Sequence, residues 1–473
     1  VWQRIKGFTV QRGAEWRYNG NYSGRNWTVM ASSLSKIHTR TNVSLNVSRG
    51  KVEHNVEGTH LTDNLTTPTP YSDGIQHRFQ LVEGISSRLY IYGALWNVQN
   101  VRLISIMVQG YVFKNLWCVL YYTVDKSDNG IRVKPVVKEL HTNKSPYTSA
   151  AIKCPNKPEQ HAGDVPLFVG LVESETAAPN QTFPVENLNK DAGTLQEFTV
   201  CVPALFKMTN AALLVQKIEM IRFFGAGRLV LYNTSISSNV DAVLRMYTSD
   251  WLEGRETFEV VVLPWNLPTE NGKTINIPYY AQQLAIDDCM YRYKRLSKYM
   301  VFNDLDEFLV PLKHENWSAL VAERRRMKPN SIGWLFRSSV LNEDRPSPAP
   351  GFEDDYMRYG SGILGLISRD QFVYPPNDRA KLIVDPTTIE EMGVHLIWKG
   401  GGVTDNLPVD VGMLFHYRKP LGECRRQVRE TRLVDKYGKR LVAALQKSWS
   451  RLPAVELGWT PWKAADKTKC KES

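Results

Sequence analysis

The sequence lacks long apolar runs. Its 473 residues contain no stretch of about 18 or more consecutive apolar side chains, so no transmembrane helix is predicted within it. The first residues, Val1-Trp2-Gln3-Arg4, do not have the pattern of a signal peptide. Because the chain also begins without a methionine, we expect that a segment upstream of it was removed.

Cysteine is scarce, and its spacing does not suit a metal. The sequence has no Cys-x-x-Cys pair and no Cys/His spacing of the kind found in zinc sites. An even number of cysteines fits a few disulfides in an oxidising compartment, and the sequence leaves their pairing open. The six are Cys118, Cys154, Cys201, Cys289, Cys424 and Cys470.

Positive charge is in excess but is not concentrated. The 59 Lys and Arg residues against 48 Asp and Glu give a net charge of +11, which suits nucleic acid, a membrane surface or an anionic small substrate. The densest basic runs, at residues 324–326 and 425–426, are short and typical of solvated helix faces. This dispersion argues against a nucleic-acid partner, and the 42% hydrophobic content argues against a disordered chain.

Sequons for N-glycosylation are plentiful. A single Asn-x-Ser/Thr match carries little weight, but nine matches, five of them before residue 70, indicate the secretory pathway. They begin at Asn21, Asn26, Asn42, Asn46, Asn64, Asn143, Asn180, Asn233 and Asn316. We therefore expect a lumenal or secreted protein.

The chain divides into four stretches of different character. Residues 1–74 are rich in Asn, Thr, Ser and Gly and are predicted to be a glycosylated stem or arm. Residues 75–195 consist of β-branched and aromatic segments between turn residues, which predicts a β-sandwich-like accessory module that is a candidate for carbohydrate binding. Residues 196–440 alternate strands with helices, as in a doubly wound α/β domain, and residues 441–473 form a C-terminal tail.

One helix and one strand of the α/β domain stand out. The apolar residues Leu214, Ile218, Ile221 and Phe224 are spaced to form one face of a helix over residues 212–224. Residues 299–303 read as a buried strand late in the domain. Since ligands of such sheets bind beyond the carboxyl ends of the strands, the residues after 303 are the first place to look for a site.

Three carboxylates follow that strand. Asp304 and Asp306 are two residues apart, so in an extended segment both point to one face, and Glu307 follows directly. Carboxylate oxygens with open positions suit a hard divalent cation that also binds substrate phosphates. A nucleotide-sugar diphosphate requires such a cation, because the metal neutralises the charge that develops on the leaving nucleotide.

Residues 302–311 resemble the DxDEF(I/L)xP core of glycosyltransferase family 92. Three further stretches resemble that family in the same order, namely residues 219–226 leading to 231–233, residues 381–386 followed by 392–395, and residues 414–418. The resemblance implies a GT-A fold (α/β, Rossmann-like), inverting chemistry, UDP-galactose as donor and Mn²⁺ as metal. It further implies a type II Golgi membrane protein, whose membrane anchor would lie upstream of this chain.

The acceptor is less tightly constrained by the resemblance. Members of the family extend core fucose in nematodes, terminal galactose in birds and β-galactan in plants. We expect transfer in β1,4 linkage to a terminal β-galactoside of glycoprotein N-glycans, with core fucose as the alternative. A non-catalytic carbohydrate-binding protein is a competing hypothesis, which the retention of both Asp304 and Asp306 disfavours.

Further residues are assigned candidate roles. His416 is the expected third metal ligand beside Asp304 and Asp306, and His395 competes with it for that role. Lys381 and Arg418 are candidates to bind the diphosphate of the donor together with the two aspartates.

The acceptor side of the site has its own candidates. Trp334 and Trp398 are expected to stack on the acceptor sugar. The general base of an inverting transfer is expected in the acidic loop after residue 341, at Glu343 or Asp344.

Overall fold

The computed structural model describes residues 77–127, 129–140, 144–156, 165–186, 195–419 and 425–460, together with four short N-terminal strands. Strand β1 (Trp2–Ile5) pairs with β2 (Phe8–Gln11), and β3 (Trp16–Asn19) pairs with β4 (Thr28–Ala31). The rest of the predicted stem lies outside the described residues, as do Cys424, Cys470 and the sequons at Asn21, Asn26, Asn42, Asn46, Asn64 and Asn143.

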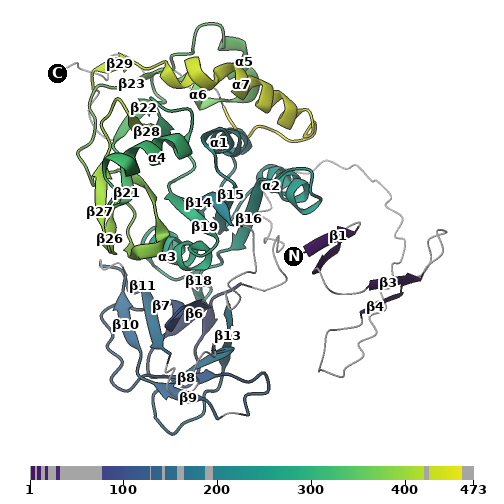
Figure 1. Ribbon diagram of the computed structural model, residues 1–473, viewed down its shortest axis with the longest axis vertical. Helices are drawn as coiled ribbons and strands as arrows, with labels where there is room; N and C mark the ends of the chain where they lie inside the picture. The colour runs from purple at the N-terminus through teal and green to yellow at the C-terminus, as the bar shows by residue number, and fades with distance from the viewer. Residues whose placement is uncertain are drawn as a thin grey trace. The chain divides into compact units, whose positions relative to one another are not determined.

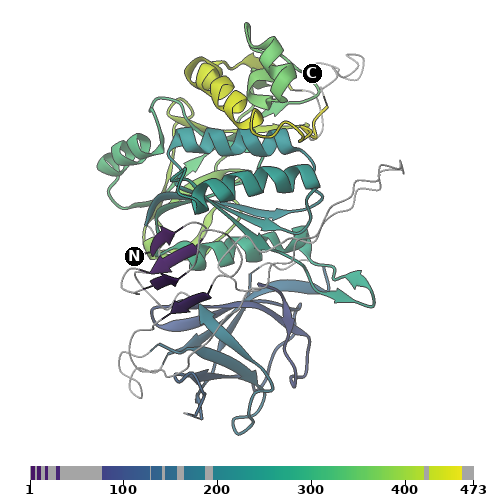
Figure 2. The ribbon, with the colours of Figure 1, turned by 90° about the vertical axis from the view of Figure 1, so that its right-hand side faces the viewer.

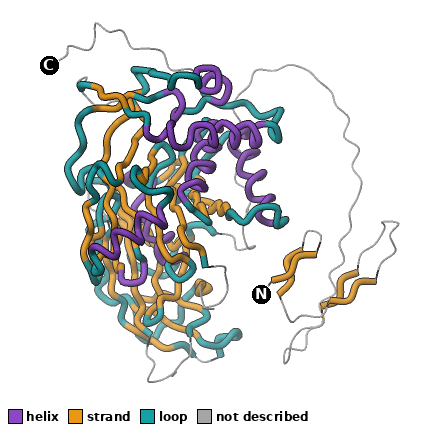
Figure 3. Tube along the Cα trace, turned by 45° about the horizontal axis from the view of Figure 1, so that its top comes forward, coloured by secondary structure: helices purple, strands orange, loops and turns teal. Residues whose placement is uncertain are grey.

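Residues 77–195 form a β-rich module without a described helix (Figures 1 and 3). Its strands follow the order β10-β11-β7-β6-β13-β12-β8-β9, with β5 at the side of β6. Every pair is antiparallel except β13 with β6. The strands are β5 (Gln80–Leu81), β6 (Leu89–Asn97), β7 (Asn100–Val108), β8 (Trp117–Tyr121), β9 (Ile131–Val133), β10 (Val136–Glu139), β11 (Tyr147–Pro155), β12 (Phe168–Val172) and β13 (Thr182–Glu186).

The two halves of this module enclose one apolar core. Ile91 and Leu103 of β6 and β7 share a buried cluster with Leu120 of β8 and Val169 of β12. A disulfide from Cys118 to Cys154 joins β8 to β11 beside this cluster. The region is β-rich as predicted, but β13 connects the halves into one strand path, so the pairing does not give a sandwich of two separate sheets.

A seven-stranded sheet begins at residue 196, and its order is β16-β15-β14-β19-β24-β21-β27. The first four strands are parallel, as predicted, whereas β24 runs antiparallel to both of its neighbours. The strands are β14 (Gln196–Leu205), β15 (Arg228–Asn233), β16 (Glu259–Pro264), β19 (Ser297–Phe302), β21 (Ser331–Phe336), β24 (Lys381–Val384) and β27 (Val403–Asn406).

Helices cover both faces of this sheet (Figure 2). Helices α1 (Ala211–Phe224) and α2 (Ser238–Leu252) pack on one face, and α3 (Gln282–Tyr293) packs on the other. A disulfide from Cys201 to Cys289 attaches α3 to β14. The protein therefore has the mixed α/β architecture that the alternating pattern predicts.

A five-stranded sheet follows, in the order β20-β28-β22-β23-β29. Its strands are β20 (Glu307–Pro311), β22 (Ser338–Asn342), β23 (Ser368–Asp370), β28 (Gly412–Arg418) and β29 (Gln427–Arg429). The remaining elements are the hairpins β17 (Thr269–Glu270) with β18 (Lys273–Thr274) and β25 (Ile389–Met392) with β26 (Ile397–Gly400), the helices α4 (Trp317–Met327), α5 (Glu353–Tyr359), α6 (Gly362–Gly365) and α7 (Arg432–Trp449), and the 3-10 turns Pro278–Ala281 and Pro386–Thr388.

Helix α7 corrects one predicted boundary. It continues without interruption across residues 440 and 441, where the catalytic domain was expected to give way to a tail. Its apolar residues Leu441 and Leu445 belong to the same buried cluster as α1. None of the described helices is both long enough and apolar enough to cross a bilayer.

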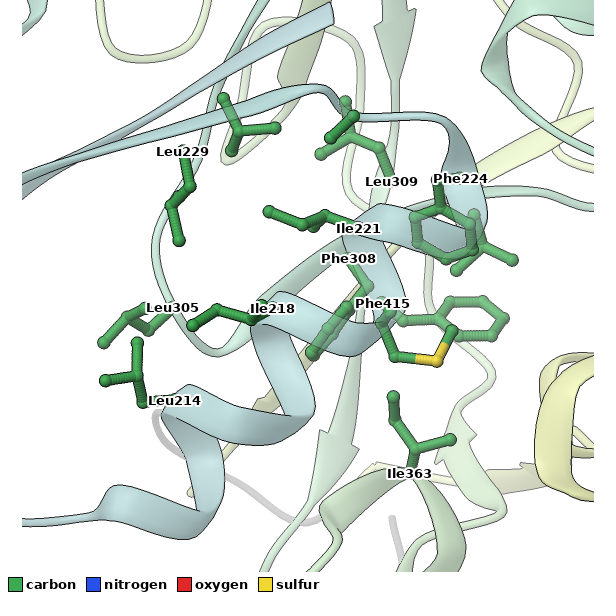
Figure 4. Packing of buried hydrophobic residues seen from close by; sticks show 14 of the residues in the cluster. Leu214, Ile218, Ile221, Phe224, Leu229, Leu305, Phe308, Leu309, Ile363 and Phe415 are labelled. Atoms are coloured by element: carbon green, nitrogen blue, oxygen red, sulfur yellow. The ribbon is translucent and has the colours of Figure 1, made fainter. Parts of the chain in front are cut away.

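Helix α1 forms where the spacing predicts it and ties the acidic motif to the core. The side chain of Asn210 caps its first turn, and Gly225 ends it in the left-handed conformation with φ 104°. The buried face of the helix, with Ile218 and Ile221, lies against Phe308 and Leu309 of β20 (Figure 4). The strand that follows the three carboxylates is thus held by apolar packing on α1.

The β-rich module packs on the α/β domain through buried ion pairs to α3. Arg102 of β7 forms a bidentate pair with Asp287, with N···O distances of 2.8 and 2.6 Å. Arg292 bonds both Asp288 on its own helix and Glu186 of β13. Because these charges are withdrawn from water, each depends on its partner for compensation.

We predict that Arg102→Met destabilises the whole protein by roughly 3–5 kcal/mol, because it leaves the Asp287 carboxylate buried without a counter-charge. The double variant Arg102→Met/Asp287→Leu should recover most of the loss. Urea unfolding of the three proteins measures this. A single variant as stable as the unaltered protein would show that the pair does not hold the module.

The described sequons differ in exposure. Asn180 is exposed, Asn233 is fully buried at the end of β15, and Asn316 caps α4.

In material secreted from eukaryotic cells, we predict a glycan on Asn180 and none on Asn233. Peptide mass spectrometry before and after glycosidase treatment tests this, with Asn180→Gln as the control. A glycan on Asn233 would contradict the buried strand.

Candidate active site

Asp304 and Asp306 lie in the turn between β19 and β20, and Glu307 is the first residue of β20. The three carboxylates thus lie at the carboxyl end of the parallel strands, as the sequence predicts. The backbone N–H of Asp304 donates to Oε2 of Glu307 at 2.9 Å, and Nδ2 of Asn303 donates to the carbonyl oxygen of Glu307 at 2.8 Å. The side chains of Asp304 and Asp306 are 38% and 35% exposed, whereas that of Glu307 is buried. Two carboxylates thus face solvent and one faces inward.

Lys217 supports this turn from α1. Its Nζ donates to the carbonyl oxygens of Asp304 at 2.9 Å and Glu307 at 2.6 Å. The side chain is fully buried, and burial lowers the pKa of Lys217 well below its usual range. Lys217 was not among the site residues predicted from the sequence. A lysine three residues after Leu214 and four before Ile221, on the apolar face of the helix, is the signal that could have identified it.

Lys381 reaches the carboxylates from β24. Its Nζ lies 3.2 Å from Oδ2 of Asp304 and 3.3 Å from Oε2 of Glu307. Burial alone would lower the pKa of Lys381, but the negative charges of Asp304 and Glu307 outweigh it and raise that pKa. Lys381 is therefore at the site, as expected, but its ammonium group is engaged with protein carboxylates rather than presented to a diphosphate.

His416 of β28 faces Asp306. Its Nε2 lies 3.3 Å from Oδ2 of Asp306, and its Nδ1 lies 3.5 Å from Oε1 of Glu307. Burial would lower the pKa of His416, but the hydrogen bond to Asp306 and the charge of Glu307 raise it overall. The register explains the approach, because Glu307 and His416 are direct neighbours on adjacent strands.

The expected metal trio is not assembled as such. Among the described residues, no three His, Cys, Asp or Glu side chains are grouped closely enough to hold a metal. Asp306 and His416 do approach each other, and Glu307 lies behind His416 as an outer carboxylate that orients the ring. A carboxylate and an imidazole with open positions fit a divalent cation that takes its other ligands from substrate phosphates and water.

The loop after β22 carries a carboxylate with an altered pKa. Burial and the nearby charge of Asp306 raise the pKa of Glu343 to about 7. The backbone N–H of Glu343 donates to the carbonyl oxygen of Arg418 at 3.3 Å, so the two residues are neighbours at the ends of β22 and β28. Asp344 follows, with its N–H bonded to Oδ1 of Asn342. Glu343 is thus both close to the carboxylate turn and poised to exchange a proton near neutral pH.

His395 and Gln282 lie at the margin of the same site. The Nδ1 of His395 is 3.0 Å from the carbonyl oxygen of Ala380. Burial lowers the pKa of His395, and the charge of Lys381 lowers it further. The Nε2 of Gln282 donates to Oδ1 of Asp304 at 3.3 Å, a contact that the sequence did not suggest. His416, not His395, is thus the histidine that faces Asp306.

The two tryptophans proposed for acceptor stacking differ. Trp334 is 0% exposed, and its ring packs edge-on against Tyr299 in the core, so the expectation that it stacks on a sugar is wrong. Trp398 is 41% exposed on β26 and covers Gly393. Its acceptor role stays a prediction.

Residues 196–461 match the family model of glycosyltransferase family 92. The galactan beta-1,4-galactosyltransferase GALS3 of Arabidopsis thaliana is 28% identical over 222 residues, which cover 45% of this chain and 40% of that protein. The beta-1,4-galactosyltransferase galt-1 of Caenorhabditis elegans is 28% identical over 120 residues, 24% of this chain and 26% of its own. The matches thus span less than half the length of these relatives.

Among solved structures, a UDP-glucose pyrophosphorylase from Acinetobacter aligns over 55% of this chain and 95% of its own, at 8% identity and a TM-score of 0.22. A TM-score this low supports no conclusion about fold or function.

Proposed function

The chain belongs to glycosyltransferase family 92, and on this basis we propose that it transfers galactose from UDP-galactose to a terminal β-galactoside of glycoprotein N-glycans, in β1,4 linkage and with inversion. The observation that carries the proposal is that the matched segment contains the whole cluster of Asp304, Asp306, Glu307 and His416. Relatives named as beta-1,4-galactosyltransferases support the sugar and the linkage.

Within this proposal the seven-stranded sheet is the nucleotide-binding half of a GT-A fold, because its parallel strands end at the carboxylate turn. Asp306 and His416 would hold Mn²⁺, with Asp304 beside them. When bound, the cation neutralises the charge that develops on the departing diphosphate. Arg418, next to Glu343 at the strand ends, supplies a further positive charge for the phosphates.

Glu343 is the general base in this proposal. The acceptor hydroxyl gives its proton to the Glu343 carboxylate. At the same time the acceptor oxygen bonds to the anomeric carbon of galactose, and the bond between that carbon and UDP breaks. A carboxylate with a pKa near 7 accepts this proton more readily than an exposed one. Transfer to core fucose would use the same groups, so it stays the alternative acceptor.

We propose the Golgi lumen, or secretion, as the location of the chain. Two disulfides within the described residues suit an oxidising compartment. The upstream membrane anchor expected from the family stays a prediction.

Asp306→Asn and His416→Ala should each weaken Mn²⁺ binding and lower kcat/KM by roughly 10³-fold or more, because each removes a metal ligand. Asp410→Asn, which alters an exposed carboxylate paired with Lys313, is the matched control. Electron paramagnetic resonance of free Mn²⁺ measures binding, and release of UDP measures activity. Unchanged Mn²⁺ affinity in both variants would refute the metal site.

Glu343→Gln should lower kcat by roughly 10²–10⁴-fold, whereas Asp344→Asn in the same loop should retain activity. Because the base must be deprotonated, kcat/KM of the unaltered enzyme should fall as the pH drops, with an inflection no higher than about 7. This acid limb should disappear in Glu343→Gln. If Asp344→Asn loses the limb instead, Asp344 is the base.

A further inference from the structure

One face of the five-stranded sheet continues outward from His416. Across this sheet Glu307 pairs with His416, His416 with Val340, and Asp370 with Gln427. Leu341 pairs with Arg369 in an antiparallel register, which places Asp370 beside Val340. Residues aligned in this way share one face, and neighbouring strands are about 4.8 Å apart, so Asp370 lies about 10 Å from His416 on the face of the active site.

The opposite face of the same sheet is apolar. Phe308, Leu341 and Phe415, each one residue away from the aligned row, belong to the buried core beneath α1 and α7. The aligned residues, from Glu307 to Gln427, therefore lie outside that core. Packing against α1 and α7 does not explain why Asp370 and Gln427 are polar.

Asp370 is a buried carboxylate near several arginines. The residue is 4% exposed, and Nε2 of Gln427 donates to its Oδ1 at 2.5 Å. Within the part of the chain that the structure describes, no Lys, Arg or His forms an ion pair with it. Burial raises the pKa of Asp370, and the hydrogen bond from Gln427 and the charges of Arg425, Arg345 and Arg369 offset this only in part. Keeping a carboxylate that lacks a direct ion pair out of water costs stability.

Two buried polar atoms without a partner and an aromatic ring lie near Asp370. Among the described residues, Oε1 of Gln427 and Nη1 of Arg425 are buried without a hydrogen-bond partner. The guanidinium of Arg425 lies 4.1 Å from the ring centroid of Phe372, which is 44% exposed. Acceptors, a donor and an exposed ring thus gather at one place on the active-site face.

We propose that Asp370, Gln427 and Phe372 form the subsite that binds the acceptor glycan, an inference that rests on the proposed function. A sugar hydroxyl would donate to Oδ2 of Asp370, while Gln427 holds the carboxylate in place through Oδ1. The apolar face of the sugar would pack on the exposed part of Phe372. The position fits, because the row leads from the residues proposed to bind the metal and crosses β22, whose last residue, Asn342, directly precedes Glu343.

The test separates acceptor binding from donor chemistry. Asp370→Asn and Phe372→Ala should each raise the KM for N-acetyllactosamine at least tenfold, while the KM for UDP-galactose and the slow hydrolysis of UDP-galactose without acceptor stay unchanged. Asp410→Asn is the matched control, and thermal unfolding verifies that each variant is folded. An acceptor KM within twofold of the unaltered value, or a raised donor KM instead, overturns the subsite.

Equilibrium binding keeps the subsite testable if the proposed function fails. Titration of N-acetyllactosamine, and separately of a core-fucosylated glycan without galactose, is followed by saturation-transfer NMR with UDP and Mn²⁺ present. We expect the unaltered protein to bind one of them and Asp370→Asn to lose that binding. Binding without any hydrolysis or transfer would refute the proposed enzyme but support the subsite. Binding of neither glycan, or equal binding by the variant, refutes the subsite.

Discussion

The Glu307 carboxylate is the point on which the site depends. It is buried, and it meets the ammonium of Lys381, the ring of His416 and the backbone N–H of Asp304 at the same time. A buried carboxylate is tolerated only when its oxygens are satisfied in this way. With the Glu307 carboxylate held in this position, the side chains of Asp304 and Asp306 point toward solvent, and His416 is turned toward Asp306. Lys217 fixes the same turn by donating to the carbonyl oxygens of Asp304 and Glu307, so lysines from α1 and β24 hold this acidic segment together.

The amino-acid pattern predicted the centre of the site better than its surroundings. A buried strand followed by Asp304, Asp306 and Glu307 is a local signal, and the structure places it at the carboxyl end of parallel strands. The resemblance to a family supplied His416. Lys217 and Gln282 were not predicted, because their roles arise from contacts across 87 and 22 residues of sequence that no local pattern encodes.

The errors have physical causes of the same kind. Trp334 was expected to bind sugar, but each face of strand β21 packs in an apolar cluster, Trp334 in one and Leu335 in the other, so the indole is buried. The boundary at 440 failed because helix α7 is amphipathic and buries Leu441 and Leu445 against the core. A fragment that ended there would lose the buried residues Leu441, Leu445 and Ser448 of the helix. The helical spacing of the buried residues Leu433, Tyr437, Leu441 and Leu445 continues across residue 440.

The β-rich module is better understood as an integral part of the α/β fold than as an independent domain. Strand β6 is buried on both sides, since Ile91 faces the core of the module while Tyr92 packs with Trp265 of the α/β domain. The module also supplies Arg102 and Glu186 to charges on α3, whose first residue, Gln282, contacts Asp304. The side of the module that meets α3 is buried in this interface, so any glycan that the module binds must contact another surface of it. Helix α3 thus contacts both the module and the carboxylates. Because the module supports α3, this contact is a sufficient physical reason for the β-rich module and the α/β domain to be joined.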